Sequence, residues 1–320
     1  MPERLPPAQQ LANLKKLQTE FEAAYAKGLK TGDPARAEEL KSHIETGAIA
    51  LRESLDSRPN AERILGLDFL GPKDVEAVFG VRPTARMTFS NPDLERAKEL
   101  GQQYIDYVDT MNVPDPESGE MQTGVPVTME NLKKYFPKAH DNNPMWYSQD
   151  WYNNEAFFKN ERPRVGGRLT SKEVIPNSTS KNYLQQTDLL IEHLKNLVFR
   201  GGTVPLPKEY EDAIAEYQTK RPEIDALMNA NKWQDASKIL SELVITKLTR
   251  ETPVEAMYRL ILNSKARQQK PLPSIYSWTA GRASDGILVY VGSFGGDGAD
   301  VDGVDPTVSD GALGACFSRM

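Results

Sequence analysis

The sequence predicts an α+β protein, and three observations lead to that class. In 8–57 and again in 208–266, apolar residues recur at spacings of three and four, which indicates helices with one apolar face. In 271–320, many Gly and Asp residues separate short runs of Val, Leu and Phe, a pattern typical of short strands joined by turns. Residues 168–175 also favour a strand. Helical and strand patterns thus occupy mostly different parts of the chain, as in α+β proteins.

Residues 1–60 are expected to form a helical hairpin. Leu11 and Phe21 belong to the apolar stripe of the first helix, and Asp33 followed by Pro34 provides an N-cap and a first helical residue for the second. The Lys and Glu residues of the hairpin are interpreted as a solvated face. An alternative is a docking arm that joins the rest of the chain to a partner, because two short helices seldom stand without packing on something.

Mostly helices are also predicted between 60 and 136. We expect two short apolar helices in 60–79, a longer helix from Pro92 to about Thr110 capped by Ser90 or Asn91, a loop at 113–124, and a helix at 129–136 capped by Thr128. The stretch NNPMWYSQDWYNNEAFF at 142–158 concentrates aromatic side chains. We interpret them as core, since each buries a large apolar area, with a sugar-stacking platform as the alternative.

The strand at 168–175 is followed by further helical patterns. We expect a turn at 176–180 and helices at 181–199, at 209–220, across 233–248, and after Thr252 and Pro253, which supply an N-cap and a first helical residue.

Several classes of protein are excluded by composition. A net charge of −6 argues against nucleic acid or an anionic membrane as the main partner. The single Cys316 excludes an internal disulfide and is expected to be a small buried hydrophobic side chain. His43, His140 and His193 are too scattered to be metal ligands, and neither a phosphate loop nor a G-x-S-x-G elbow occurs. We therefore expect no catalytic residue, no metal and no cofactor.

Two features bear on where the chain resides. No apolar run is long enough to cross a bilayer, and the first ten residues, MPERLPPAQQ, lack the apolar core of a signal peptide. We expect no direct membrane insertion. The chain is then cytoplasmic, virion-associated or displayed through a partner.

The most informative stretch is 271–320, which contains no Lys, Glu, Gln, Asn or His although exposed turns normally use several of these. One set of its positions resembles a fixed scaffold of strands and obligatory turns: Trp278, Thr279, Arg282, Ser284, Gly286, Leu288, Val289, Val291, Gly292, Phe294, Gly298, Ala299, Val301, Pro306, Ser309, Leu313, Gly314, Cys316, Phe317 and Arg319. The interleaved set holds residues that look arbitrary: Ala280, Gly281, Ala283, Asp285, Ile287, Tyr290, Ser293, Gly295, Gly296, Asp297, Asp300, Asp302, Gly303, Val304, Asp305, Thr307, Val308, Asp310, Gly311 and Ala312. Each residue type in this variable set can be encoded by an Asn codon whose adenines have been replaced. Lys, Glu, Gln, Met and Trp cannot arise in that way, and none occurs in the set.

The pattern W-T-x-x-R-x-S-x-G-x-L-V-x-V-G-x-F-x-x-x-G-A-x-V, followed by P-x-x-S-x-x-x-L-G and a terminal C-F-S-R, resembles the variable repeat of variable proteins made by diversity-generating retroelements. The likeness is greatest to those of archaea, their viruses and small-genome bacteria. It implies a C-type lectin-like domain over 61–320, with a helical insertion at about 200–250 and a variable region at about 277–314. It also implies that adenine-specific mutagenic retrohoming diversifies a ligand-binding surface. WYNNEAFF and GGRLTSKEVIP extend the likeness more loosely.

The resemblance predicts a binding protein in which fixed residues fill the core and variable ones contact an unknown ligand, a protein or a surface glycan. Tyr290 is the expected anchor, because tyrosine brings amphipathic area at low entropic cost. The aspartates favour a cationic or hydroxyl-rich ligand.

Two alternatives remain, a calcium-dependent carbohydrate-binding lectin and a structural or tail assembly protein. The stretch GGDGADVDG at 295–303 follows a calcium-binding repeat at first, but Asp302 stands where an apolar residue belongs and Val304 stands where an EF-hand needs a ligand. We therefore predict no metal site and interpret the aspartates as products of codon replacement.

Overall fold

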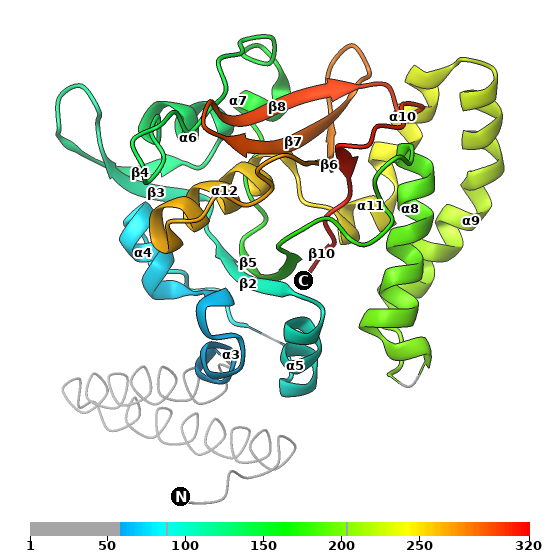
Figure 1. The fold of residues 1–320 in the computed structure, drawn as a ribbon, viewed down its shortest axis with the longest axis horizontal. Coiled ribbons are helices and arrows are strands. Elements are labelled where there is room, and N and C mark those ends of the chain that lie inside the picture. Colours follow the sequence, from blue (N-terminus) through cyan, green and yellow to red (C-terminus); the bar gives the residue numbers. More distant parts are fainter. Residues whose placement is uncertain (1–57, 88, 203) are drawn as a thin grey trace, which may run out of the picture. The chain divides into compact units, whose positions relative to one another are not determined.

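The computed structural model describes residues 58–87, 89–202 and 204–320, which belong to one compact unit, Ser57–Met320. They combine helices with several sheets, which confirms the α+β class (Figure 1). The helical hairpin predicted for 1–60 falls almost wholly outside the described residues. Within the part that is described, no helix has the length and apolar character needed to cross a membrane.

Helices and strands alternate in the first part of the described chain. In order they are α3 (Arg58–Leu65), η1 (Gly66–Asp68), β1 (Phe69–Leu70), α4 (Pro72–Phe79), α5 (Asn91–Glu99), β2 (Gln102–Tyr107), β3 (Thr110–Pro114), β4 (Met121–Pro126), α6 (Met129–Tyr135), α7 (Ala156–Lys159) and β5 (Gly166–Ser171). A helical part follows, made of α8 (Tyr183–Glu192), a π-helical turn η2 (His193–Val198), η3 (Arg200–Gly202), α9 (Lys208–Asn229), α10 (Trp233–Glu242), α11 (Val244–Thr249) and α12 (Pro253–Arg267). The chain ends in β6 (Tyr276–Arg282), β7 (Leu288–Gly295), β8 (Gly298–Val304), β9 (Leu313–Gly314) and β10 (Ser318–Arg319).

Two four-stranded sheets organise these elements. One has the order β1-β2-β5-β10, so the last strand of the chain pairs with β5, where Arg319 lies opposite Leu169. The other has the order β8-β7-β6-β9, with β9 parallel to β6. The C-terminal segment therefore contributes to both sheets, and all of the second sheet is built from it.

Helix α12 packs against the second sheet and supplies much of the main core. Val254, Met257 and Ile261 of the helix are fully buried in one cluster with Val289 and Val291 of β7. Burial of this many apolar side chains, each worth about 1.5 to 3 kcal/mol, is the main source of stability for this face of the sheet. Thr252 caps the helix by accepting from Glu255 N, as predicted from its sequence.

The helices of 208–249 form a second apolar cluster at the far end of the same sheet (Figure 1). Tyr210, Tyr217 and Leu240 are buried there together with Trp278 and Leu313 of the C-terminal segment. The helical character predicted for 200–250 is confirmed, and these helices pack directly on the strands that carry the variable set.

Two local predictions were wrong. The helix expected to run to Thr110 ends at Glu99, because Gly101 adopts a left-handed φ of 66° and the chain then enters β2. Every residue of β2 is buried, including Gln102, Gln103 and Asp106, so its sequence shows neither polar–apolar alternation nor the apolar run of a buried strand. Of the stretch 113–124, expected to be a loop throughout, only 115–120 form a loop, and the residues on either side belong to β3 and β4.

Charged side chains lie inside this core as well. Glu251 is 4% exposed and accepts from Arg259 Nε at 2.9 Å and from Tyr107 Oη at 3.0 Å. Glu255 is fully buried and accepts from Arg164 Nε at 2.8 Å. Buried charges are stable only when paired in this way, so these residues fix how α12 meets the strands around it.

Candidate functional site

The pleat of the second sheet places several of the variable side chains on one of its faces. Successive side chains on a strand point to opposite faces. On β7, Val289 and Val291 are buried against α12 while Tyr290 between them is half-buried. On β8, Val301 is buried while Asp300 and Asp302 on either side of it remain accessible. The alternation along these strands therefore places variable side chains on the face of the sheet turned away from α12.

The structure leaves nearly all of the variable set accessible. Some positions are exposed: Asp285, Gly296, Asp297, Thr307, Asp310 and Gly311. Others are half-buried: Ala280, Ile287, Tyr290, Ser293, Gly295, Asp300, Asp302, Gly303, Val304, Asp305, Val308 and Ala312. These two groups together are called the variable face below.

Two members of the set do not belong to that face, which corrects the prediction for Gly281 and Ala283. Both are buried, and Ala283 packs in the main core at 1% exposure. A Cβ on Gly281 would lie 2.3 Å from Pro253 Cγ, so no larger residue fits there without movement of α12. The codon pattern could not reveal that these two positions are buried, because Gly and Ala are both products of adenine replacement.

The fixed set shows the opposite distribution. All of its members are buried except Arg282, which is half-buried, and Ser284 and Ser309, which are exposed. Ser284 has a bonding role despite its exposure, since its N and Oγ both donate to the Glu155 carboxylate, at 2.8 and 2.7 Å. Apart from these exceptions, the division made on the sequence pattern thus matches a physical division between core and surface.

The glycines separate in the same way. At Gly292, a Cβ would lie 2.2 Å from the backbone oxygen of Ile275, and at Gly298 it would lie 2.4 Å from the backbone carbon of Trp146. At Gly296 nothing lies within 4 Å of such a Cβ, and at Gly311 the first contact is at an ordinary 3.8 Å. Gly292 and Gly298 are therefore required by close backbone approach, whereas Gly296 and Gly311 can be replaced. The variable Gly303 is an exception, since a Cβ there would lie 2.7 Å from Ile287 Cδ1.

Three aspartates of the variable face have a local structural role that the sequence analysis missed. The Oδ1 atoms of Asp285, Asp305 and Asp310 each accept from the backbone N two residues further on, at 3.1, 2.9 and 2.7 Å respectively. These are Asx turns, which Asn can also form. An Asn codon would thus encode a residue suited to all three turns.

A cavity of about 350 Å³ opens within the variable face. Part of its lining comes from residues outside the variable set: Tyr147, Gln149, Pro273, Tyr276 and Gly298. The rest comes from the variable set: Ser293, Gly295, Gly296, Asp297 and Asp300. Tyr147 is 43% exposed although its neighbour Trp146 is core. The sequence analysis favours core for the aromatic side chains of 142–158, with a sugar-stacking platform as the alternative; Tyr147 is not core, and Trp151 is half-buried.

The carboxylate of Asp300 is held in position within the cavity. Its Oδ1 accepts from Gln149 Nε2 at 2.9 Å and its Oδ2 accepts from Tyr276 Oη at 3.1 Å. Burial raises the pKa of this carboxyl, and the Asp302 carboxylate raises it further. No Lys, Arg or His of the described ranges forms an ion pair with Asp300, so its charge is balanced only by neutral hydrogen-bond donors.

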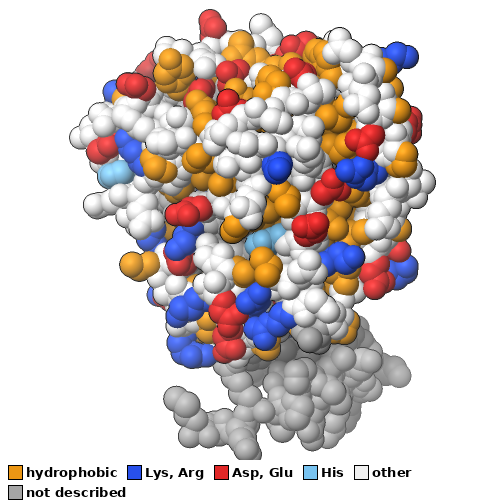
Figure 2. Space-filling model, turned by 45° about the vertical axis from the view of Figure 1, so that its right-hand side comes forward, with side chains coloured by type: hydrophobic (Ala, Val, Ile, Leu, Met, Phe, Trp, Pro, Cys, Tyr) orange, Lys and Arg blue, Asp and Glu red, His pale blue; other side chains and the backbone are white. Residues whose placement is uncertain are grey.

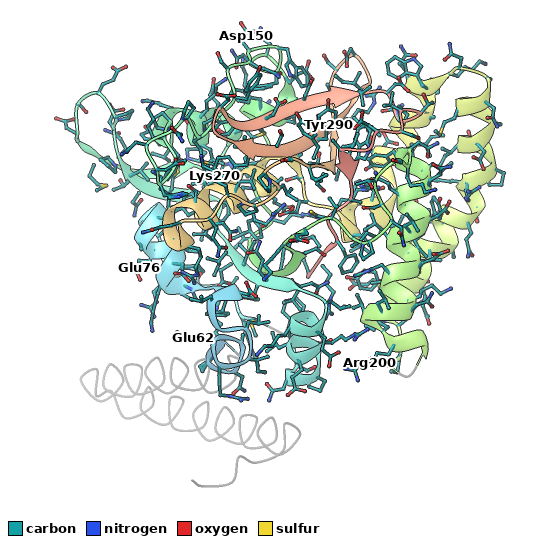
Figure 3. The ribbon with its side chains drawn as sticks, viewed as in Figure 1. Glu62, Glu76, Asp150, Arg200, Lys270 and Tyr290 are labelled. Carbon is teal, nitrogen blue, oxygen red and sulfur yellow. The ribbon has the colours of Figure 1, made fainter. Side chains whose placement is uncertain are left out.

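Tyr290, the expected anchor, is tied to the core more closely than the sequence suggested. Its ring packs edge-on against Trp278 and Tyr276, with centroids 5.5 and 5.0 Å apart. Burial, followed by the Asp302 carboxylate, raises the pKa of its hydroxyl. Tyr290 lies towards the same end of the molecule as Asp150 and opposite to Glu62 and Arg200 (Figure 3). It therefore contributes to the variable face and also covers Trp278.

Basic side chains are scarce at this end of the molecule. In Figure 2 the upper part, at the height of β7 and β8 in Figure 1, shows acidic, hydrophobic and uncharged atoms with few basic ones, whereas basic side chains are more frequent below. Among the described residues, no three carboxylate, histidine or cysteine side chains converge in a way that could hold a metal ion. Cys316 is buried and free, as predicted.

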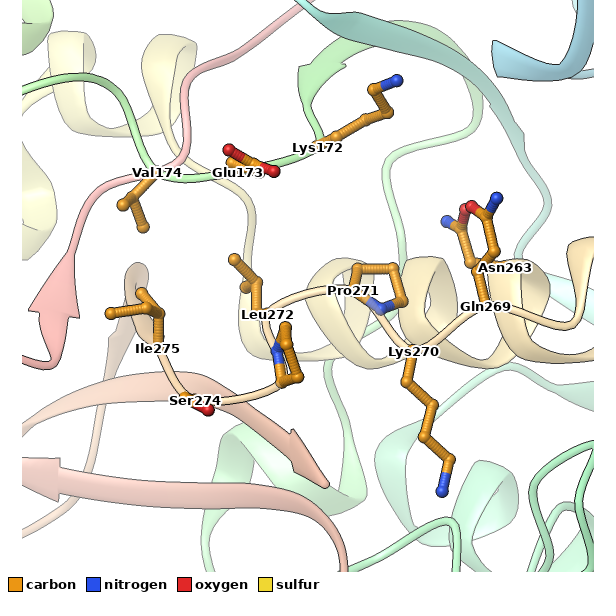
Figure 4. Close-up of a pocket in the computed structure, with 11 residues that line it drawn as sticks. Lys172, Glu173, Val174, Asn263, Gln269, Lys270, Pro271, Leu272, Ser274 and Ile275 are labelled. Carbon is orange, nitrogen blue, oxygen red and sulfur yellow. The ribbon is translucent and has the colours of Figure 1, made fainter. Parts of the chain in front are cut away.

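A second, larger cavity of about 590 Å³ lies between the 172–174 segment and the 269–275 segment. The side chains of Lys172 and Lys270 extend away from one another at its edges (Figure 4). Lys172 is paired with Asp68 at 2.9 Å and Lys270 with Asp141 at 2.8 Å. Both amines at this cavity are thus already engaged.

Fold and site together define an α+β protein that carries an accessible, acidic and glycine-rich face on a buried apolar sheet. Comparison of the chain with known proteins found no matching family model, no similar curated protein and no similar solved structure.

Proposed function

We propose that this chain is a ligand-binding protein whose C-terminal surface is diversified by adenine-specific mutagenic retrohoming on a C-type lectin-like scaffold. One observation carries the proposal. Positions that the sequence pattern marks as variable, all of them residue types that an altered Asn codon can encode, are, apart from Gly281 and Ala283, accessible positions of one C-terminal segment. The positions selected as fixed are, apart from three, buried. The division drawn from the sequence pattern thus largely coincides with the division between accessible and buried positions.

The mechanism of binding follows from this separation. Replacement of an exposed residue usually changes stability by no more than about 0.5 kcal/mol. Residues of the variable face can therefore change the ligand without unfolding the sheet that α12 supports. The ligand in this proposal is a protein or a surface glycan that complements an acidic surface.

The test is to sequence the 3′ end of this gene across its source population. We expect replacements to concentrate at codons of the variable face and to fall on adenines of the corresponding template, while Trp278, Gly292, Phe294 and Leu313 stay unchanged. A uniform segment, or one that differs mainly by synonymous changes spread along the gene, would remove the basis of the proposal.

The same experiment separates this function from the two alternatives. A calcium-dependent lectin or a tail assembly protein requires no excess of replacements at these codons. Thermal denaturation with and without Ca²⁺ is the direct test of the lectin, because a ligand that binds only the folded state raises its stability.

A further inference from the structure

We infer that the 350 Å³ cavity is the part of the variable face that receives a ligand, and that in this variant it accepts the cationic side chain of a lysine or arginine of a protein partner. The inference rests on the proposed function and identifies the chemical class of the ligand. It follows from the shape, the charge and the mixed origin of the cavity lining.

The cavity is open because two of the positions that line it are glycines, which have no side chain. Gly295 and Gly296 form part of the lining, and a Cβ at Gly296 would meet no atom within 4 Å. Larger residues that an altered Asn codon can encode, such as tyrosine, would project from this position. The glycines therefore leave open a space that other variants of the same segment would occupy.

The charge comes from Asp300 and Asp297. Asp300 is half-buried, and both of its oxygens accept from neutral donors. A carboxylate that is partly removed from water and has no cationic partner gains free energy when a cation with hydrogen-bond donors reaches it. The nearby Lys270 does not serve as that partner, because its amine is paired with Asp141 and donates to the Gly295 carbonyl oxygen.

The scaffold side of the cavity makes such a cation fit better. Tyr147 and Tyr276 line it, and aromatic faces attract cations by about 0.5 to 2 kcal/mol. Gln149 and Tyr276 also act as positioning residues, since their hydrogen bonds hold the Asp300 carboxylate in one orientation. Neither is in the variable set, so in the proposed function other variants keep these two residues and change the variable half of the lining.

The experiment is a titration of the ¹⁵N-labelled full chain followed by NMR. The probes are N-acetyl-arginine amide and N-acetyl-lysine amide, with the uncharged N-acetyl-norleucine amide and methyl α-mannoside as controls. We expect the cationic probes to shift the Gly295, Gly296 and Gly298 amide signals in a saturable way. The uncharged probes should bind at least tenfold more weakly.

Two variants test the assignment to this cavity. Asp300→Asn keeps the shape and should weaken the arginine probe about tenfold or more, whereas Asp302→Asn, on the same face but outside the cavity lining, should change binding less than threefold. Gly296→Tyr should block the cavity in a protein that melts at an unchanged temperature. Binding that is equal for norleucine, preferred for the mannoside, or unaffected by both Asp300→Asn and Gly296→Tyr would overturn the inference.

Failure of this inference and failure of the proposed function are distinguishable. If population sequences vary at the variable face but the cationic probes do not bind, only the cavity assignment is wrong. If the probes bind as expected but the population sequences are uniform, the cavity stands as a cation site and diversification is refuted.

Discussion

The variable face and the interior around α12 both carry carboxylates, but they use them in opposite ways. On the face, Asp285 and Asp310 are exposed and their hydrogen bonds go to nearby backbone N–H groups. In the interior, Glu251 and Glu255 are buried and each is bonded to an arginine from another position in the fold. Water solvates the side chains at the two aspartate positions, whichever residue stands there. Each buried glutamate, in contrast, depends on its arginine partner in one geometry. Substitutions on the variable face should therefore cost little stability, whereas substitutions of the buried carboxylates should destabilise the fold.

The largest expected effect is at Trp278, the buried residue opposite Tyr290 on the neighbouring strand. Trp278 is 1% exposed and contacts both Tyr183 and Tyr290. Trp278→Ala should destabilise the protein by about 4 kcal/mol, because it leaves a large cavity in the core. Urea denaturation checks this, with Asp297→Asn as an exposed control expected within about 0.5 kcal/mol. A neutral Trp278→Ala would contradict the separation of core and face.

Removal of one interior charge should be nearly as severe. Glu251→Gln leaves the guanidinium of Arg259 buried without its counter-charge, and we expect a loss of about 3 kcal/mol. The change can be measured by urea denaturation at pH 7. If Glu251→Gln and Asp297→Asn had the same small effect, the contrast between interior and face would fail.

A matched pair of glycines sharpens the comparison within a single strand and its turn. Gly292→Ala would push a methyl group into the backbone of Ile275 and should cost about 2 to 3 kcal/mol. Gly296→Ala meets no atom and should be neutral or slightly stabilising, since alanine restricts the unfolded chain. Equal melting temperatures for the two variants would show that the fixed glycines are not required.

Glu161 lies between the exposed and the buried carboxylates in its accessibility. It is half-buried, and its Oε2 has no hydrogen-bond partner. Burial, followed by the Glu255 carboxylate, raises its pKa from 4.5 to about 7. The folded state therefore binds its proton more tightly than the unfolded state, so the stability from this group is present below pH 4.5 and is lost as the pH rises through 7. Between pH 4.5 and 8 this loss should reach about 1.5 kcal/mol after allowance for solvent screening.

Glu161→Gln should remove that pH dependence and make the protein more stable than the parent at pH 8. The measurement is thermal denaturation at pH 4.5, 6 and 8, with the exposed Glu173→Gln as the control. If the parent and Glu161→Gln lost stability in parallel between pH 4.5 and 8, Glu161 would not have the raised pKa.

The smallest of these effects is expected at Tyr290, where face and core meet. Loss of its edge-on contacts with Trp278 and Tyr276 should cost about 1 kcal/mol, less than a core substitution and more than an exposed one. Urea denaturation of Tyr290→Ala measures this, with Tyr290→Phe, which keeps the ring, as the control. A loss above about 3 kcal/mol would place Tyr290 in the scaffold instead of the variable face.

The sequence by itself determined the α+β class, the caps at Thr128 and Thr252, and most of the division of the C-terminal segment into core and surface. These features are local, because capping residues and strand alternation express themselves within a few neighbouring positions. The uniform burial of β2 gave no alternation, so its strand was missed.

Tertiary structure decided what depended on distant partners. Only the packing of Pro253 against Gly281 shows that this glycine is fixed, and only the fold brings Gln149 to Asp300 across 151 positions. The cavity likewise joins the exposed Tyr147 to a turn far along the chain. Composition records which residues a segment uses, but contacts between remote segments set which of them are free to change and where a ligand has room to bind.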